Sequence, residues 1–169
     1  MGFYVWRGFV EFDTSGIDDD ATIAQANVYL TAAGIDNEYD FDVRVHKFDW
    51  ASPIAAGNRE ANYDGALAST FDAVWRNTSA IVANTSYASS NLDTTWVSKT
   101  GFTRYALLSS RDVSATEPDW NLEQIAIYAQ EHATQAYRPY LSVTVAAAGQ
   151  PMMLRGTTVP HMRQWHPRF

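Results

Sequence analysis

The fold is decided first by residues 3–13, Phe-Tyr-Val-Trp-Arg-Gly-Phe-Val-Glu-Phe-Asp. The second half of this stretch alternates, with Val10 and Phe12 on one side and Glu11 and Asp13 on the other. An apolar–polar alternation with a period of two is typical of a β-strand that has one buried face. Residues 3–13 therefore predict an opening strand whose apolar face needs a cover.

A second alternating run follows at residues 22–31, where alternate apolar side chains share one face, namely Ala24, Ala26, Val28 and Leu30. The turn-forming residues 14–20 separate the two runs, so we expect the two strands to pair in antiparallel fashion. A two-stranded ribbon cannot hide its apolar face alone. The remainder of the chain must therefore supply a second sheet.

Further short strands are predicted at residues 41–47, 102–110, 122–128 and 140–145, and residues 71–75 and 80–83 are each expected to be a short strand or a loop edge. Residues 102–110 are apolar on both faces, which places that strand at the centre of a sheet. Residues 60–67 are expected to form a short helix or an irregular crossover. One or two helical turns are expected at residues 92–101, closed by Gly101.

Seven or so strands predict an all-β fold, an antiparallel β-sandwich of jelly-roll type with one short helix and an extended C-terminal tail. The composition changes after the last strand, and neither a helical nor a strand period continues. We assign residues 1–146 to the sandwich and residues 147–169 to the tail.

Composition narrows the class of protein. The 169 residues fit one domain, and the absence of cysteine excludes disulfides and thiolate metal sites. No secretion signal is recognised in the chain, and no apolar run approaches the roughly 20 residues that span a bilayer. We therefore expect a soluble protein or part of a larger assembly, without membrane insertion.

Charge is divided unevenly along the chain. The net charge is −7, yet residues 147–169 hold three arginines and no acid, which leaves 9 − 19 = −10 on the remainder. An acidic body disfavours nucleic acid as a partner, because phosphate recognition needs a basic face. A basic tail can instead attract the acidic body of a neighbouring copy.

Four ordered blocks resemble a known family. They are Arg7-Gly-Phe-Val-Glu-Phe-Asp-Thr-Ser-Gly-Ile, Ala21-Thr-Ile-Ala-Gln-Ala-Asn-Val-Tyr-Leu, Gly101-Phe-Thr-Arg-Tyr-Ala-Leu-Leu-Ser-Ser-Arg-Asp and Tyr137-Arg-Pro-Tyr-Leu-Ser-Val-Thr-Val. Together they look like the DNRLRE-type β-sandwich domain, which occurs in bacterial and archaeal surface proteins, in some polysaccharide-binding modules and in viral proteins. The resemblance runs from about Arg7 to Val145 and lacks the family's usual opening strands.

The missing strands suggest how the chain associates. A sandwich without an edge strand exposes unpaired backbone groups, which invites a strand from another chain or a covering tail. We expect the tail to dock on a partner subunit; the alternative is a disordered end. The expected docking residues are Phe3, Val5, Met152, Met153, Leu154, Arg155, Val159, Met162, Arg163 and Trp165.

Aromatic side chains offer a second kind of site. Trp50, Trp75 and Trp120 lie in or near predicted loops, where flat rings can act as platforms for sugars. The alternative is that these rings belong to the core, as most aromatic side chains in a sandwich do. Residues 18–20, Asp-Asp-Asp, are compatible with a Ca²⁺ site, but a solvated turn is favoured, and neither a metal nor a cofactor is expected.

No catalytic pattern accompanies these features. The four histidines lack metal-ligand spacing, His46 is expected on the surface of a strand, and no Gly-x-Ser-x-Gly elbow occurs. The leading expectation is a non-enzymatic structural protein, a virion component such as a capsid decoration or fibre subunit. It would form homo-oligomers, or bind another virion protein, through sheet edges and the tail. The alternative is a carbohydrate-binding module of a surface or extracellular protein, which recognises a surface glycan.

Overall fold

The computed structural model describes residues 5–36, 38–116, 123–146 and 151–159. Within them the strands are β1 (Gly8–Asp13), β2 (Ile23–Asp36), β3 (Asp42–Lys47), β4 (Thr70–Asn77), β5 (Ser86–Ala88), β6 (Phe102–Ser109), β7 (Gln124–Ile127), β8 (Tyr140–Val145) and β9 (Pro151–Val159). The α-helices are α1 (Arg59–Leu67) and α2 (Ser110–Val113), and single 3₁₀ turns occur at Thr78–Ala80, Thr94–Trp96 and Gln135–Tyr137.

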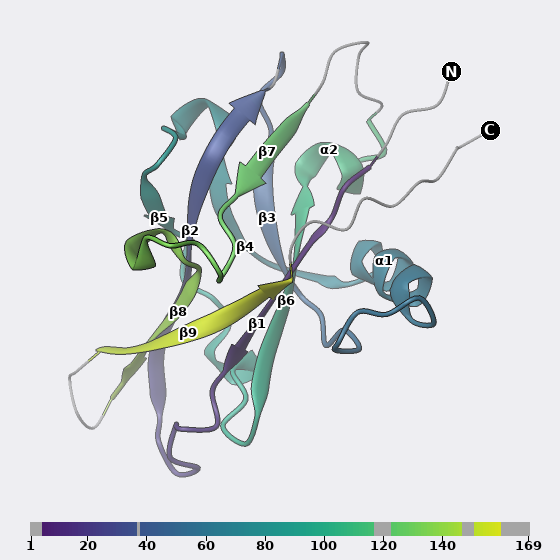
Figure 1. Ribbon diagram of the computed structural model, residues 1–169. Coiled ribbons are helices and arrows are strands. Elements are labelled where there is room, and N and C mark those ends of the chain that lie inside the picture. The colour runs from purple at the N-terminus through teal and green to yellow at the C-terminus, as the bar shows by residue number, and fades with distance from the viewer. Residues whose placement is uncertain (1–4, 37, 117–122, 147–150, 160–169) are drawn as a thin grey trace.

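The strands form two antiparallel sheets that pack face to face (Figure 1). The first sheet has the order β4-β3-β6-β1, and the second has the order β8-β2-β5, with β7 paired to the far half of β2. Alternate apolar residues from both sheets fill the space between them, including Val10, Val45 and Tyr105 from the first and Val28 and Val143 from the second. The predicted all-β antiparallel sandwich is thereby confirmed, and the jelly-roll subtype stays a prediction.

The first two strands do not pair with each other, so that prediction is wrong. β1 pairs with β6 and β9, whereas β2 pairs with β5, β7 and β8. The connection over residues 14–22 is longer than the two to five residues of a usual hairpin loop, and it crosses from one sheet to the other. Phe12 and Leu30 consequently meet in the same buried core from opposite sheets.

Strand β9 joins the two sheets along one side of the sandwich. Its first half, from Pro151 to Arg155, pairs with β8, and its second half, from Gly156 to Val159, pairs with β1. Figure 1 shows this strand running from β8 across to β1. The sandwich therefore extends beyond Ala146, where the sequence analysis placed its end. The open edge of β1 is covered by a strand of the same chain.

The other side of the sandwich is closed by the segment that contains β5. Backbone amides of Ser89 and Leu92 donate to carbonyls of Val28 and Ala26 in β2, while the amide of Ser90 donates to the carbonyl of Val74 in β4. This segment thus bonds to both sheets. Strand β9 covers the edge of β1 along most of its length, and the amide of Ser90 joins the β5 segment to β4 at Val74.

Several local predictions are confirmed and others are wrong. The short helix, the central position of β6 and the strand at β4 match the predictions. Of the two alternatives for residues 80–83 the loop edge is the one observed, because the side chain of Asn77 accepts a hydrogen bond from the amide of Ser79 and caps a 3₁₀ turn at Thr78–Ala80. In the stretch 92–101 a single 3₁₀ turn ends at Trp96, well before Gly101.

The outer face of the first sheet is divided into a covered half and an open half. Phe9, Trp50, Ala66, Ala106 and Leu108 form a second apolar cluster, in which α1 and the chain before it cover the sheet. Further along the same face, Glu11 lies opposite Arg104 and Asp13 lies opposite Phe102. This second, polar half of the face carries the candidate site.

Candidate functional site

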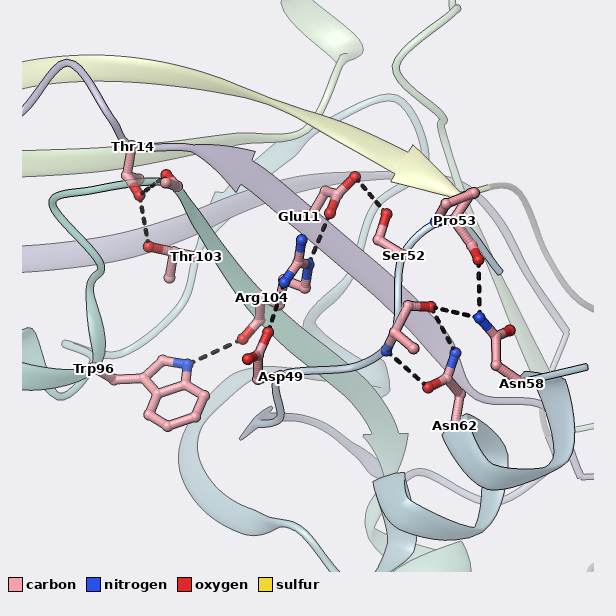
Figure 2. A network of polar contacts seen from close by, with 12 residues as sticks. Glu11, Thr14, Asp49, Ser52, Pro53, Asn58, Asn62, Trp96, Thr103 and Arg104 are labelled. Carbon is pink, nitrogen blue, oxygen red and sulfur yellow. Dashed lines mark hydrogen bonds and ion pairs between the residues drawn. The ribbon is translucent and has the colours of Figure 1, made fainter. Parts of the chain in front are cut away.

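A shallow pocket of about 180 Å³ lies on the open half of the first sheet. Its walls come from the first residues of β6, from the chain after β3 and from the segment that contains the 3₁₀ turn before β6. The lining residues are Asp49, Trp96, Ser98, Phe102, Thr103 and Arg104. Figure 2 shows the polar contacts that hold these walls together.

Arg104 is the centre of the site because it joins three parts of the chain. Its Nε donates to Oε2 of Glu11 at 2.8 Å, and its Nη1 donates to Oδ1 of Asp49 at 2.6 Å. Glu11 is its cross-strand neighbour on β1, whereas Asp49 comes from the connection after β3. In Figure 2 the guanidinium lies between the two carboxylates. Charge-assisted bonds on two sides fix its orientation.

A second layer of hydrogen bonds supports this arrangement. The hydroxyl of Ser52 donates to Oε1 of Glu11 at 3.0 Å, so both oxygens of that carboxylate are engaged. The indole Nε1 of Trp96 donates to the backbone carbonyl of Arg104 at 3.0 Å, which holds the Trp96 ring at the pocket wall. Such supporting contacts keep the lining side chains in place before any ligand arrives.

The base of the pocket is tied down by two threonines. Thr14 Oγ1 donates to the carbonyl of Gly101 at 2.8 Å and lies 2.9 Å from Thr103 Oγ1. Thr103 Oγ1 also accepts from the amide of Ser98 at 2.9 Å. These bonds fasten the segment between the 3₁₀ turn and β6 to the end of β1.

One aromatic ring of the pocket faces outward. Phe102 is 47 % exposed, and the Arg104 Cζ lies 5.6 Å from the centroid of its ring. On its other side Arg104 lies 5.7 Å from the ring of the buried Trp50. The guanidinium therefore sits between a buried ring and an exposed ring, and the exposed ring presents an apolar surface beside charged groups.

The charge of the site is negative overall. Burial lowers the pKa of Arg104, but its hydrogen bonds to Glu11 and Asp49 outweigh that effect and raise the pKa above its ordinary value. One cation against the carboxylates of Glu11 and Asp49 leaves −1. Asp13, opposite Phe102, adds another negative charge, since the hydrogen bonds from Ser15 lower its pKa.

Two polar atoms remain for a ligand at the ion pair of Arg104 and Asp49. In the part of the chain that the structure describes, neither Oδ2 of the largely exposed Asp49 nor Nη2 of Arg104 has a hydrogen-bond partner. One atom accepts and the other donates, and both belong to side chains that are already joined through Oδ1 and Nη1. The arrangement suits recognition of polar groups beside an apolar surface.

The aromatic residues that the sequence analysis proposed as sugar platforms do not form this site. Trp50 and Trp75 are fully buried, and Trp75 Nε1 donates to the carbonyl of Tyr87 inside the sandwich. That part of the prediction is wrong, because both rings face core clusters rather than solvent. Trp120 lies outside the described residues. Phe102 and Trp96, which the analysis missed, are the rings at the pocket.

Of the expected docking residues that the structure describes, all but Val5 belong to β9. Met153 is 58 % exposed on β9, whereas Val5 and Leu154 are half-buried. The backbones of Met152, Arg155 and Val159 belong to β9, whose pairing partners are β8 and β1 of the same chain. Outside the described residues lie Phe3, Met162, Arg163 and Trp165. Docking of this segment on a partner stays a prediction.

A second group of titratable side chains lies inside the molecule. Three of their atoms, His46 Nε2, Asp72 Oδ2 and Tyr105 Oη, are buried and have no hydrogen-bond partner among the residues that the structure describes. Burial lowers the pKa of His46 and raises the pKa of both Asp72 and Tyr105, so burial favours the neutral form of each. The prediction that His46 lies on the surface is wrong, because Phe71 and Ser69 pack over it. These groups do not open into the pocket.

Neither a group of metal-ligating side chains nor a membrane-spanning helix occurs in the described ranges. Within them, no group of three or more acidic or histidine side chains is placed to hold a metal ion, and Asp18, Asp19 and Asp20 lie exposed in the turn after β1. None of the helices found there has the length and apolarity needed to cross a bilayer.

Comparison with known proteins gives no relative from which a function can be transferred. No protein-family model, no curated protein and no solved structure matches the chain. The resemblance to DNRLRE-type domains therefore stays a prediction. The functional argument rests on the geometry of the site alone.

Proposed function

We propose that this chain is a non-enzymatic β-sandwich module that binds carbohydrate at the pocket between Asp49, Trp96 and Phe102. The observation that carries the proposal is the exposed Phe102 ring beside the ion pair of Arg104 and Asp49. A sugar ring has an apolar face of C–H groups and a rim of hydroxyls. An exposed aromatic ring matches the face, while a carboxylate and a guanidinium match the rim.

The shape of the site suits a chain of sugars rather than an enclosed small molecule. The pocket is shallow, and its polar side chains are held by Glu11, Ser52 and the Trp96 indole before a ligand binds. Preorganised side chains lose little conformational entropy on binding. Because contact area is small, we expect weak affinity for a single sugar and stronger binding for an oligosaccharide.

Phe71 provides a matched control for the role of Phe102. It is 48 % exposed, lies on the outer strand of the same sheet and has the Arg44 Cζ 5.6 Å from its ring centroid. Phe71 and Phe102 therefore have nearly the same exposed fraction, and each has an arginine Cζ at the same distance from its ring centroid. Phe71 does not line the pocket. If binding is lost when Phe102 is substituted but not when Phe71 is, then binding depends on the pocket and not on exposed aromatic rings in general.

The experiment is a glycan array on the whole chain, followed by calorimetric titration of the oligosaccharide hexamers that score highest. We expect F102A and D49A each to weaken binding at least about tenfold, because each removes one half of the recognition surface. F71A should bind like the wild type. Folded wild-type protein without a glycan ligand above background, or equal losses in F102A and F71A, would refute the proposal.

A structural role in an assembly is a second proposal, with a virion component as the expected setting. Met153 favours it, because a large apolar side chain that is 58 % exposed on β9 can pack against another subunit. Strand β9 covers the edge of β1 that was expected to be open, and assembly through the other sheet edges stays a prediction.

This second proposal is tested by light scattering at low and high salt. If Met153 is a docking residue, M153E should shift an oligomer of the wild type toward monomer. V82E is the control, because Val82 is 63 % exposed in a loop away from β9. A wild-type monomer under all conditions would count against self-assembly. It would leave glycan binding as the function to pursue.

A further inference from the structure

The charges around the pocket determine which sugars it accepts. We infer that the site selects uncharged glycans and rejects acidic ones, such as chains of uronic acids. This inference rests on the proposed function, because it names the ligand class of the same pocket. Three features support it: Arg104 is already bonded to two carboxylates, acidic side chains surround the pocket, and the atoms that remain for a ligand suit hydroxyl groups.

The only cation that lines the pocket in the described part of the chain is already paired with two carboxylates. Arg104 already donates from Nε to Glu11 and from Nη1 to Asp49. A guanidinium that recognises a carboxylate uses two parallel N–H donors. A sugar carboxylate would therefore place a third negative charge on a guanidinium that Glu11 and Asp49 already share, whereas a neutral hydroxyl group would not.

The surrounding acids also repel a negative ligand. Glu11, Asp13 and Asp49 surround Arg104 and Phe102, so these residues sum to −2. Lys99, which follows the lining residue Ser98 in the chain, donates from Nζ to the carbonyl of Asp19 at 2.9 Å. The whole chain carries −7, which adds to the repulsion at low salt.

The available atoms suit a pair of neighbouring hydroxyl groups. Oδ2 of Asp49 can accept from one hydroxyl, and Nη2 of Arg104 can donate to the next. A hydroxyl group both donates and accepts, so two adjacent hydroxyls on a sugar complete this pair without a change in charge. The exposed ring of Phe102 is then beside the sugar, and an apolar C–H face can rest on it.

The test uses pairs of oligosaccharides that differ only in charge, for example mannohexaose against hexamannuronate and the corresponding glucose pair. Titrations are run with the whole chain at low and high salt. We expect the neutral member to bind at least about tenfold more tightly at low salt. The ratio should shrink at high salt, because exposed charges are screened.

Asp13 supplies a variant that probes charge without touching the binding atoms. D13N removes one negative charge opposite Phe102, so it should raise the affinity for the acidic member about twofold and leave the neutral member unchanged. F102A should abolish the binding of both members.

The outcomes separate the inference from the proposed function. Tighter binding of the acidic member, lost in F102A, would overturn the inference and keep glycan binding. Absence of Phe102-dependent binding by any oligosaccharide would overturn both. Preference for the neutral member that D13N reduces would support both.

Discussion

Arg7 and Asp112 form a buried two-bond ion pair that fastens the first strand to the helical cover of the sheet. Arg7 Nε lies 2.6 Å from Asp112 Oδ2, and Nη2 lies 2.9 Å from Oδ1. The remaining donor, Nη1, bonds to the carbonyl of Tyr63 in α1 at 2.6 Å, and the Tyr63 ring lies 3.9 Å from the Arg7 Cζ. The pair links residues just before β1, in α1 and in α2.

Breaking this pair on one side should destabilise the protein strongly. R7L leaves the carboxylate of Asp112 buried without its cation, and we expect a loss of about 3–5 kcal/mol in the free energy of unfolding, measured in urea. The double variant R7L/D112L removes both charges and should recover a substantial part of that loss. A loss below about 1 kcal/mol in R7L would show that the pair is not a structural clamp.

Deleting strand β9 should open the sandwich. A chain that ends at Ala146 loses one of the two partners of β1 and the outer partner of β8, so we expect a fall of at least about 5 kcal/mol in stability and increased binding of a hydrophobic dye. A chain that ends at Val159 keeps β9 and is the control; it should melt close to the full-length protein. Equal melting of all three chains would contradict the pairing of β9 with β1.

His46 should make the fold sensitive to mild acid. Burial lowers the pKa of His46, although its hydrogen bond to the Ser69 carbonyl acts in the opposite direction. The unfolded chain therefore binds a proton at a higher pH than the folded chain does. Stability should fall as pH decreases below about 6.5, the ordinary pKa of histidine, until the folded pKa is passed.

The measurement is urea unfolding at several pH values between 7.5 and 5, compared with H46Q. The glutamine amide can still bond to the Ser69 carbonyl but does not titrate, so the slope over this range should be smaller in the variant. Identical slopes in the two proteins would assign the acid sensitivity to other groups.

Asp72 should affect stability in the opposite direction. Burial raises the pKa of Asp72, although the amide of Asp93 donates to its Oδ1. The folded protein then holds a proton more tightly than the unfolded chain, so this group favours folding below its ordinary pKa of 3.8 and loses that effect as pH rises.

D72N keeps an oxygen for the Asp93 amide and removes the charge. We expect it to raise stability at pH 7 by about 0.5–1 kcal/mol after allowing for solvent screening, and to have less effect near pH 3.5. D36N, at the exposed end of β2, is the control for a general reduction of negative charge. A destabilised D72N at pH 7 would mean that the ionised carboxylate has a favourable partner.

The local pattern of the chain predicted much of the sandwich. The alternation through Val10 and Phe12, and again through Val43 and Val45, correctly marked core-facing strands. Pairing partners were harder to predict, because β1 and β2 have compatible patterns but are separated by a connection that crosses the core. Strand β9 had no readable period, since it leaves one sheet and enters the other at Gly156.

The candidate site was harder to predict than the fold. Trp50 and Trp75 were selected for their neighbouring loop residues, yet local sequence does not show that α1 and the other sheet cover them. Phe102 and Arg104 have the two-residue spacing that puts them on one face of a strand. This spacing was the only local signal that an aromatic ring and a cation would lie side by side. Their partners Glu11 and Asp49 come from distant parts of the chain.

The most direct test of the central claim is an NMR titration that follows the indole N–H signals of the whole chain with a neutral hexasaccharide such as mannohexaose or cellohexaose. The Trp96 indole bonds to Arg104 at the pocket, whereas the Trp75 indole bonds to Tyr87 in the core. Our account predicts a saturable shift of the Trp96 signal with the Trp75 signal unchanged. A glycan that binds with the Trp96 signal unmoved would contradict it, and so would the absence of any shift with every hexasaccharide tested.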